Sequence, residues 1–385
     1  MRRKRWILLL LGLVLLLPSC ITVPAAPGYS DATGTKLTSG VQPSKPKPPV
    51  PLLSAEELQK AADGILTSPS SGIVDISGTK YSYEEMAEDL QTLATVYPEH
   101  FSYHSIGKSV AGRDLYVAVL GNPNAPRQIV VSAAIHAREY MTVQLVMKQM
   151  EFYLSHYDNG SYDGVPYAGL FEQFCFYIVP MTNPDGVMIS QEGEASLPTE
   201  EMRQALVNIF RTEDHNYKTM SLYFSHWKAN ARGVDLNRNY DALWEQYNKA
   251  SQPQSSQYKG PHPASEPETQ AMVNLINGLG NIACVLCVHS QGEVIYWNCG
   301  QNEELGNRSL LFSRTVAKRN GYHVVMEQNN DASLSDWCEL KKSIVSITVE
   351  TGNVMCPLPI DQFEQIWLKN YDLLPLTARY FLGET

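Results

Sequence analysis

The sequence predicts an α/β fold, a single three-layer α/β/α domain in which helices cover both faces of a twisted mixed sheet. Short apolar, β-branched runs typical of buried strands occur at 127–135, 281–289 and 343–349. Segments with the length and apolar spacing of helices lie between them, such as 138–157. The chain of 385 residues, 44% of them hydrophobic, is long enough for one sizeable core.

The first 20 residues predict an export signal. A basic start precedes the apolar run Trp6–Leu17, which is short for a membrane-spanning helix and typical of a signal-peptide core. The run leads into "LPSC", which resembles the lipobox of bacterial lipoproteins, although Pro18 departs from the residues usual there. We therefore expect an extracytoplasmic lipoprotein, held at a membrane only by lipid on Cys20. The alternative is a plain cleaved signal and a secreted protein.

Residues 21–70 predict a Pro/Ser-rich tether with a short helix at its end, and the main domain is expected at 71–385. Within that domain, 81–99 has the spacing of an amphipathic helix that ends near Pro98. The last helical segment, 360–382, is expected to break at Pro375, because proline removes a helical hydrogen bond.

The charge of the chain limits the kinds of partner that we expect. The formal net charge is −10, and no Lys/Arg cluster occurs beyond the first five residues, so we expect no nucleic-acid partner. Cys284 and Cys287 have the spacing of a zinc or redox pair. They lie inside the apolar run 281–289, however, and we predict that they are buried strand residues.

Ionisable side chains stand where three predicted strands end. His136 and Glu139 follow the strand 127–135, His289 ends a second strand and Glu350 a third. In open α/β sheets, the carboxyl ends of strands are where ligands bind. Two imidazoles and a carboxylate suit a catalytic zinc, and a further carboxylate suits the activation of water. The pattern predicts a metal site with a neighbouring base.

The ordered set "HARE", "NPDG", "GVDLNRN", a distant "HS" and a late strand ending in Glu resembles the zinc metallocarboxypeptidases of the carboxypeptidase A type, peptidase family M14. The resemblance covers about residues 71–380. It implies one zinc per chain, bound by His136, Glu139 and His289. It also implies that Glu350 is the general base, which deprotonates the attacking water and later protonates the leaving amine.

The resemblance also implies a clamp for the substrate's terminal carboxylate, made of Asn237 and Arg238, with Arg138 as an auxiliary cation nearby. A guanidinium grips a carboxylate through two parallel hydrogen bonds, and Asn adds a donor. The alternative for "DLNRN" is a solvated loop with an Asx turn. We interpret "NPDG", 183–186, as scaffold.

The sequence departs from the family pattern in two places. The family's carbonyl-polarising arginine follows a tryptophan, where this chain has Lys228; Lys228 is the first choice for that cation and Arg232 the reserve. The tyrosine that covers the bound terminus in digestive members is missing, and its expected position falls near Gln328. The position that reads the terminal side chain falls at or next to Ser335, which is not acidic.

The segments 227–239, 289–297 and 350–367 look more like the bacterial branch that cleaves γ-D-glutamyl–diamino acid bonds in cell-wall stem peptides. We therefore expect a peptide substrate with a free C-terminal carboxylate. The alternatives are a general carboxypeptidase, an N-acyl amino acid deacylase on the same fold and a non-catalytic wall-peptide binding module. The polar insert 192–224 either forms part of the cleft rim or extends into solvent.

Overall fold

The computed structural model describes residues 72–383. The predicted export signal with Cys20, and the predicted tether with its short helix, lie outside the described residues.

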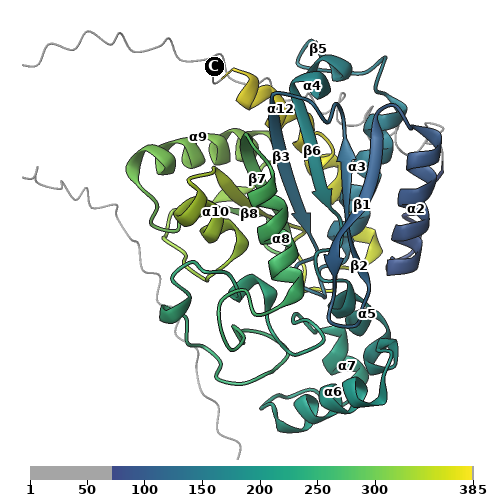
Figure 1. Cartoon of the computed structure of the whole chain (residues 1–385), viewed down its shortest axis with the longest axis vertical. Coiled ribbons are helices and arrows are strands. Elements are labelled where there is room, and N and C mark those ends of the chain that lie inside the picture. The colour runs from purple at the N-terminus through teal and green to yellow at the C-terminus, as the bar shows by residue number, and fades with distance from the viewer. Residues whose placement is uncertain (1–71, 384–385) are drawn as a thin grey trace, which may run out of the picture. The chain divides into compact units, whose positions relative to one another are not determined.

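Eight strands form one mixed sheet in the order β1-β2-β6-β3-β7-β10-β8-β9 (Figure 1). In chain order they are β1 (Phe101–Lys108), β2 (Asp114–Leu120), β3 (Arg127–Ala133), β6 (Phe174–Val179), β7 (Ile282–Ser290), β8 (Val294–Tyr296), β9 (His323–Val324) and β10 (Ser346–Thr351). A separate hairpin pairs β4 (Ser161–Tyr162) with β5 (Val165–Pro166). The four central strands β6, β3, β7 and β10 are parallel, so their carboxyl ends meet at one edge of the sheet.

Helices occur before, between and after the strands along the chain. They are α2 (Tyr83–Val96), α3 (Met141–Ser155), α4 (Tyr167–Gln173), α5 (Pro184–Glu192), α6 (Glu200–Thr212), α7 (Met220–Ser225), α8 (Pro267–Gly278), α9 (Glu303–Asn320), α10 (Leu334–Lys342), α11 (Phe363–Asn370) and α12 (Leu373–Leu382). Short 3₁₀ turns occur at η1 (Gly193–Ser196), η2 (Leu236–Arg238), η3 (Trp244–Gln246) and η4 (Ile360–Gln362).

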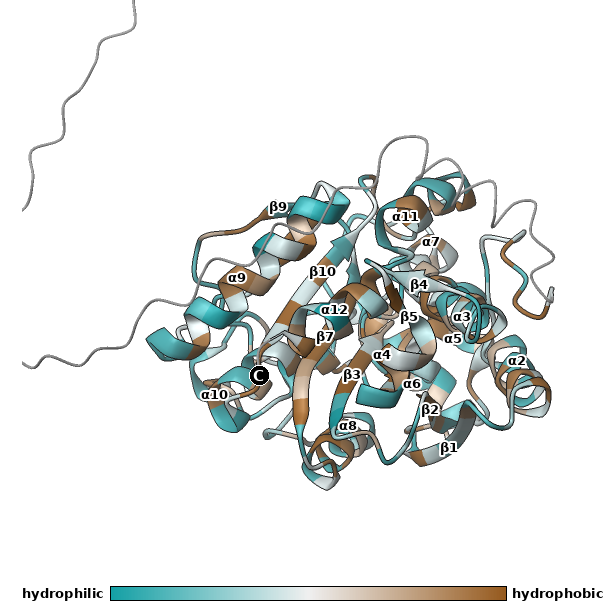
Figure 2. Cartoon of the chain, turned by 90° about the horizontal axis from the view of Figure 1, so that it is seen from above, coloured by the Kyte–Doolittle hydropathy of each residue, from teal (hydrophilic) through white to brown (hydrophobic). Residues whose placement is uncertain are grey.

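Both faces of the central strands are buried under helices. Along β3, Ile129 and Val131 belong to one core cluster while Val130 belongs to the other, as the two-residue repeat of a strand requires. The first cluster includes α3, α9, α11 and α12, and the second includes α8 and α10. Figure 2 shows helices on both sides of the strands. The α/β/α prediction is confirmed, and so are the three buried strands, which are β3, β7 and β10.

The cysteine pair and the first helix also match the predictions. Cys284 and Cys287 lie buried in β7. Helix α2 begins with a capping box: the Glu85 backbone N–H donates to the hydroxyl of Ser82, and the Ser82 backbone N–H donates to the carboxylate of Glu85.

The predicted break at Pro375 is wrong. The chain bends at 371–372, between α11 and α12, and Pro375 lies in the first turn of α12. Backbone N–H groups in the first turn of a helix have no partner within the helix, so proline is tolerated there.

The insert 192–224 packs against the domain. Leu206 and Ile209 of α6 and Tyr223 of α7 share a buried cluster with Trp227. The insert therefore supports the segment that precedes Lys228, and its exposed helix faces form the outer surface there.

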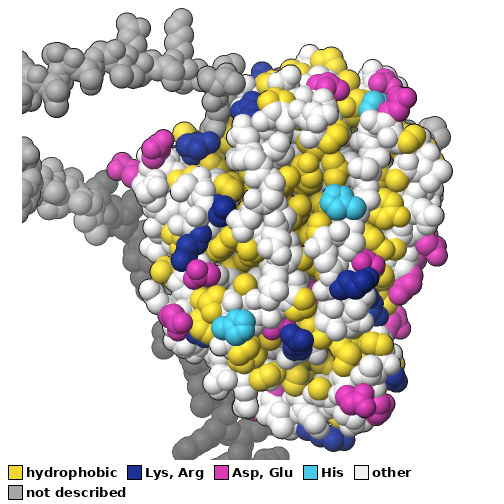
Figure 3. Space-filling model, in the orientation of Figure 1, with side chains coloured by type: hydrophobic (Ala, Val, Ile, Leu, Met, Phe, Trp, Pro, Cys, Tyr) yellow, Lys and Arg dark blue, Asp and Glu magenta, His cyan; other side chains and the backbone are white. Residues whose placement is uncertain are grey.

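The surface carries charges of both signs. On the face drawn in Figure 3, Lys and Arg side chains are interspersed with Asp and Glu. Within residues 72–383, every helix is too short or too polar to cross a membrane.

Three acidic side chains, Asp185, Glu266 and Glu268, lie buried close together beside Asn230. Asp185 is paired with Arg113 at 2.9 Å, whereas Glu268 accepts from neutral donors, the backbone N–H of Val110 at 3.1 Å and the Asn230 amide at 3.3 Å. Burial, reinforced by Asp185, raises the pKa of Glu268 to about 7.

This raised pKa predicts a pH-dependent effect of Glu268→Gln. Well below pH 4.5 the Glu268 carboxyl is protonated in both the folded and the unfolded protein. Between pH 4.5 and about 7 it ionises only in the unfolded protein, so the folded wild type loses stability as pH rises. Relative to wild type, the variant should gain roughly 3 kcal/mol of unfolding free energy between pH 4 and pH 8. Urea unfolding at both pH values measures this, with the exposed Glu84→Gln as control. A pH-independent difference would contradict the prediction.

Candidate functional site

The site is built where two adjacent parallel strands end. His136 and Glu139 lie in the turn between β3 and α3, and His289 is the penultimate residue of β7. Pairing of β3 with β7 sets Ala133 beside Val288, and pairing of β10 with β7 sets Glu350 directly opposite His289. Residues 150 positions apart are thus brought together by sheet register.

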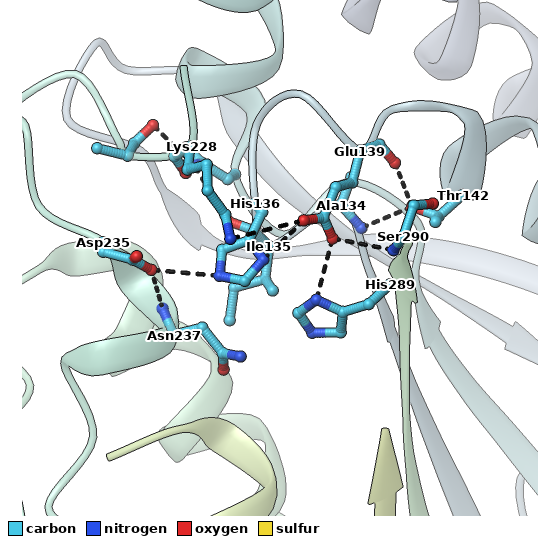
Figure 4. Close-up of polar contacts among 12 residues, drawn as sticks. Ala134, Ile135, His136, Glu139, Thr142, Lys228, Asp235, Asn237, His289 and Ser290 are labelled. Atoms are coloured by element: carbon cyan, nitrogen blue, oxygen red, sulfur yellow. Dashed lines mark hydrogen bonds and ion pairs between the residues drawn. The ribbon is translucent and has the colours of Figure 1, made fainter. Parts of the chain in front are cut away.

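The carboxylate of Glu139 lies between two imidazoles (Figure 4). Its Oε1 is 2.9 Å from Nδ1 of His136, and its Oε2 is 3.0 Å from Nδ1 of His289. The backbone N–H of Ser290 also donates to Oε2, at 3.1 Å. Burial alone would raise the pKa of Glu139, but the imidazoles, His136 foremost, lower it well below its ordinary value.

These three side chains fit a metal ion. Each is buried, and each offers one ligand atom within 4.8 Å of the others. Both imidazoles turn the same kind of nitrogen, Nδ1, toward one carboxylate. Two imidazole nitrogens and a carboxylate oxygen are the donors that catalytic zinc uses.

Asp235 is a member of the site that the sequence analysis missed. Its Oδ1 is 3.3 Å from Nε2 of His136, although the two atoms do not form a well-aligned hydrogen bond. It also accepts from the backbone N–H groups of Asn237 and Gln257, at 3.2 and 2.9 Å. Burial opposes ionisation, but His136 and Arg238 hold the pKa of Asp235 far below its usual range. The available signal was the acid that begins the "DLNRN" motif, because a metal-binding histidine commonly donates its other ring nitrogen to a carboxylate.

Glu350 stands at the end of β10 with one carboxylate oxygen unused. Its Oε2 is buried and accepts no hydrogen bond from residues 72–383. Burial raises the pKa of Glu350 to about 7, and His289 acts in the opposite direction. Glu350 therefore has an acceptor position available beside the metal donors.

Lys228 approaches the same point from another segment. Its Nζ lies 3.9 Å from Oε1 of Glu139 (Figure 4). Its backbone carbonyl accepts from the N–H of Ala137 at 3.2 Å, and its own N–H donates to the carbonyl of Ser255 at 2.9 Å. The lysine segment is therefore tied to the turn that carries His136.

The "NPDG" segment holds these parts together. Asn183 caps α5 by accepting from the N–H of Gly186 at 3.0 Å. Its amide donates to the carbonyls of Ile135 and Ala229, at 3.2 and 3.1 Å. One side chain thus joins the end of the β3 segment to the lysine segment, as the scaffold interpretation expects.

Arg238 and Asn237 face the same pocket. The Nε of Arg238 donates to the hydroxyl of Tyr247 at 2.9 Å, and Nη1 donates to the carbonyl of Asn237 at 2.7 Å. Its Nη2 lies 3.4 Å from Asp331. The Oδ1 of Asn237 accepts from the N–H of Leu334, which leaves the amide NH₂ free to donate. Tyr247 and Asp331 had no sequence signal, because only loop packing brings them to the arginine.

The structure brings most of the predicted residues together. One pocket is lined by His136, Lys228, Asn237, Arg238, Ser335 and Glu350, with Glu139 and His289 in contact beneath. Two predicted residues do not line this pocket. Arg232 is 56% exposed and lies 3.5 Å from Glu266, and Arg138 is partly buried with its Nε making no hydrogen bond to the described residues. The structure therefore favours Lys228 over Arg232 as the cation nearest the metal donors.

Replacing His289 with Ala tests the donor set. Loss of one of three ligands should lower zinc affinity by at least about 100-fold, beyond the effect of losing an outer hydrogen-bond partner. Metal analysis after dialysis against a calibrated chelator measures this. His262→Ala, at an exposed histidine, and Glu350→Gln should each retain one zinc per chain. Equal zinc content in His289→Ala and wild type would exclude His289 as a ligand.

Comparisons with known proteins identify similar chains. The zinc carboxypeptidase family, peptidase M14, matches residues 86–372. The chain is 34% identical over 293 residues to gamma-D-glutamyl-L-diamino acid endopeptidase 1 of Lysinibacillus sphaericus, covering 74% of this chain and 69% of that protein. It is 30% identical over 290 residues to the uncharacterized protein YqgT of Bacillus subtilis strain 168, covering 74% of each.

Two solved structures share the fold. Thrombin activatable fibrinolysis inhibitor aligns with a TM-score of 0.63 at 18% identity, over 86% of this chain and 81% of that one. Carboxypeptidase A from Helicoverpa armigera aligns with a TM-score of 0.59 at 18% identity, over 85% and 80%. The extent of the family match and the order of the motifs lead to one conclusion: the chain belongs to the zinc carboxypeptidase family, peptidase M14.

Proposed function

We propose that the protein is an extracytoplasmic zinc metallopeptidase that hydrolyses the bond between a γ-D-glutamyl residue and a C-terminal diamino acid in cell-wall stem peptides. The observation that carries the hydrolytic part is that Glu350 and Arg238 line one pocket with the metal-donor histidine His136. A base, a carboxylate clamp and a metal donor set are what cleavage beside a free C-terminus requires.

Zinc held by His136, Glu139 and His289 would supply Lewis acidity toward the scissile carbonyl and the attacking water. Glu350 accepts a proton from that water as the water's oxygen bonds to the carbonyl carbon. When the C–N bond breaks, Glu350 returns the proton to the leaving nitrogen. Its unused Oε2 and its pKa of about 7 suit transfer in both directions.

Lys228 and the clamp orient the substrate. Lys228, which lies close to Glu139, stabilises the negative charge that develops on the carbonyl oxygen. Arg238 and the free amide of Asn237 bind the terminal carboxylate. Tyr247 and the Asn237 carbonyl hold the guanidinium in place, which lowers the cost of ordering it on binding.

Two observations and one prediction support the diamino acid preference. The relative from Lysinibacillus sphaericus is named for that bond. The terminal-residue pocket is largely polar, since Ser335, Asn298 and Asn329 line it. The predicted lipid anchor or secretion would bring the enzyme to the cell wall.

Two substrates assayed side by side test the proposal. The zinc-loaded protein should hydrolyse L-Ala-γ-D-Glu-diaminopimelate and leave a blocked dipeptide with C-terminal Phe intact. Cleavage of the dipeptide alone would instead indicate a general carboxypeptidase. Cleavage of neither, with zinc bound, would favour a binding module.

The same assay on Glu350→Gln tests the mechanism. Loss of a general base should lower kcat by roughly 100- to 10,000-fold while zinc content is unchanged. Glu84→Gln, an exposed change of the same kind, should keep the wild-type rate. Near-normal turnover in Glu350→Gln would remove Glu350 from the mechanism.

A further inference from the structure

Three carboxyl groups line the pocket besides Glu350: Asp331, Asp336 and Glu339. Asp331 is paired with two cations, Arg238 at 3.4 Å and Lys249 at 3.7 Å. Asp336 serves the backbone, because it accepts from the N–H groups of Asp331 and Ser333, at 2.8 and 3.1 Å, in the capping box of α10. The structure thus accounts for the first two carboxyl groups.

Glu339 differs from them because its partners are all neutral. It is 2% exposed. Its Oε1 accepts from the hydroxyl of Ser309 at 2.6 Å and the amide of Gln301 at 3.2 Å, and its Oε2 accepts from the thiol of Cys299 at 3.1 Å. No Lys or Arg of residues 72–383 makes an ion pair with it. The backbone of Ser346 also hydrogen-bonds this carboxyl. Glu339 therefore has several neutral donors but no charged partner among the described residues.

Among the described residues, the Glu339 carboxyl has no cation beside it. Burial, opposed by the Ser309 and Cys299 hydrogen bonds and reinforced by Asp336, raises the pKa of Glu339 to about 8. A buried carboxyl without a charged partner costs free energy when it ionises, and a cation placed beside it removes that cost.

The position of Glu339 suits the end of a long side chain. Ser335 and Glu339 are one helical turn apart on the pocket side of α10. Thr348 and Glu350 line the pocket from β10, and the backbone of Ser346, two residues earlier, acts on the Glu339 carboxyl. At about 3.3 Å per residue, Ser346 lies roughly 13 Å along β10 from Glu350. Glu339 is therefore set back from the hydrolytic end of the pocket.

We propose that Glu339 is a specificity-determining residue, which binds the side-chain ammonium of the substrate's terminal diamino acid while Arg238 and Asn237 hold its carboxylate. This rests on the proposed function for the identity of the terminal residue. A terminal residue of the same length without the ammonium leaves the buried carboxyl without a charged partner, so the site gains no charge-assisted hydrogen bond from that residue. Glu339, the acid that selects a basic side chain, would thus lie one helical turn after Ser335 in α10.

Binding of the product-like amino acid tests this without turnover. L-Lysine and L-norleucine have the same chain length and differ by the ammonium. The full-length, zinc-loaded protein should bind lysine more tightly by on the order of tenfold or more, measured by calorimetry. Glu339→Gln should abolish the preference, and Glu339→Asp should retain part of it. Glu268→Gln, a buried carboxyl outside the pocket, should leave it unchanged.

The outcomes separate this inference from the proposed function. Hydrolysis of L-Ala-γ-D-Glu-L-Lys and its norleucine analogue is measured on the same samples. Lysine preference in binding without hydrolysis of either peptide would support Glu339 and overturn the proposed reaction. Hydrolysis with equal binding of the two amino acids, or an unchanged preference in Glu339→Gln, would overturn the role of Glu339 alone. If Glu339→Gln does not fold, the wild-type comparison and Glu339→Asp still decide.

Discussion

The carboxylate of Glu139, held between the imidazoles of His136 and His289, is the interaction on which the rest of the site depends. A buried carboxylate is costly unless charged or hydrogen-bonding partners surround it, and here each oxygen has an imidazole within 3.0 Å. The partners meet because β3 and β7 are parallel neighbours that end at one edge. A shift of register by one residue would turn His289 to the opposite face of the sheet.

The other functional groups are placed by loops that pack on this edge. Asn183 joins the segment after β3 to the segment that carries Lys228. The buried cluster around Trp227 packs against the Lys228 segment. Asp235 lies next to His136 on one side and bonds the backbone of Asn237 on the other. One buried aspartate thus connects the candidate metal donor His136 to Asn237 of the proposed carboxylate clamp.

The meeting of His136, Glu139, His289 and Glu350 could be predicted from the sequence. Each follows a buried strand, and the carboxyl ends of neighbouring parallel strands lie at one edge of the sheet. The choice between Lys228 and Arg232 could not be made from spacing, since it depends on how the segment after Trp227 folds. The partners of Arg238 and the neutral surroundings of Glu339 could not be predicted from the sequence either. They come from segments 9 to 93 residues distant from Arg238 and 30 to 40 residues distant from Glu339. The helix break was wrongly predicted at Pro375, because the effect of a proline depends on where the helix begins.

X-ray absorption at the zinc edge of the purified, full-length protein tests whether His136, Glu139 and His289 hold a catalytic zinc. We expect one zinc per chain with nitrogen and oxygen neighbours at about 2.0–2.2 Å and a pattern that fits two imidazoles. A shell of sulfur at about 2.3 Å would instead assign the metal to cysteines and exclude this donor set.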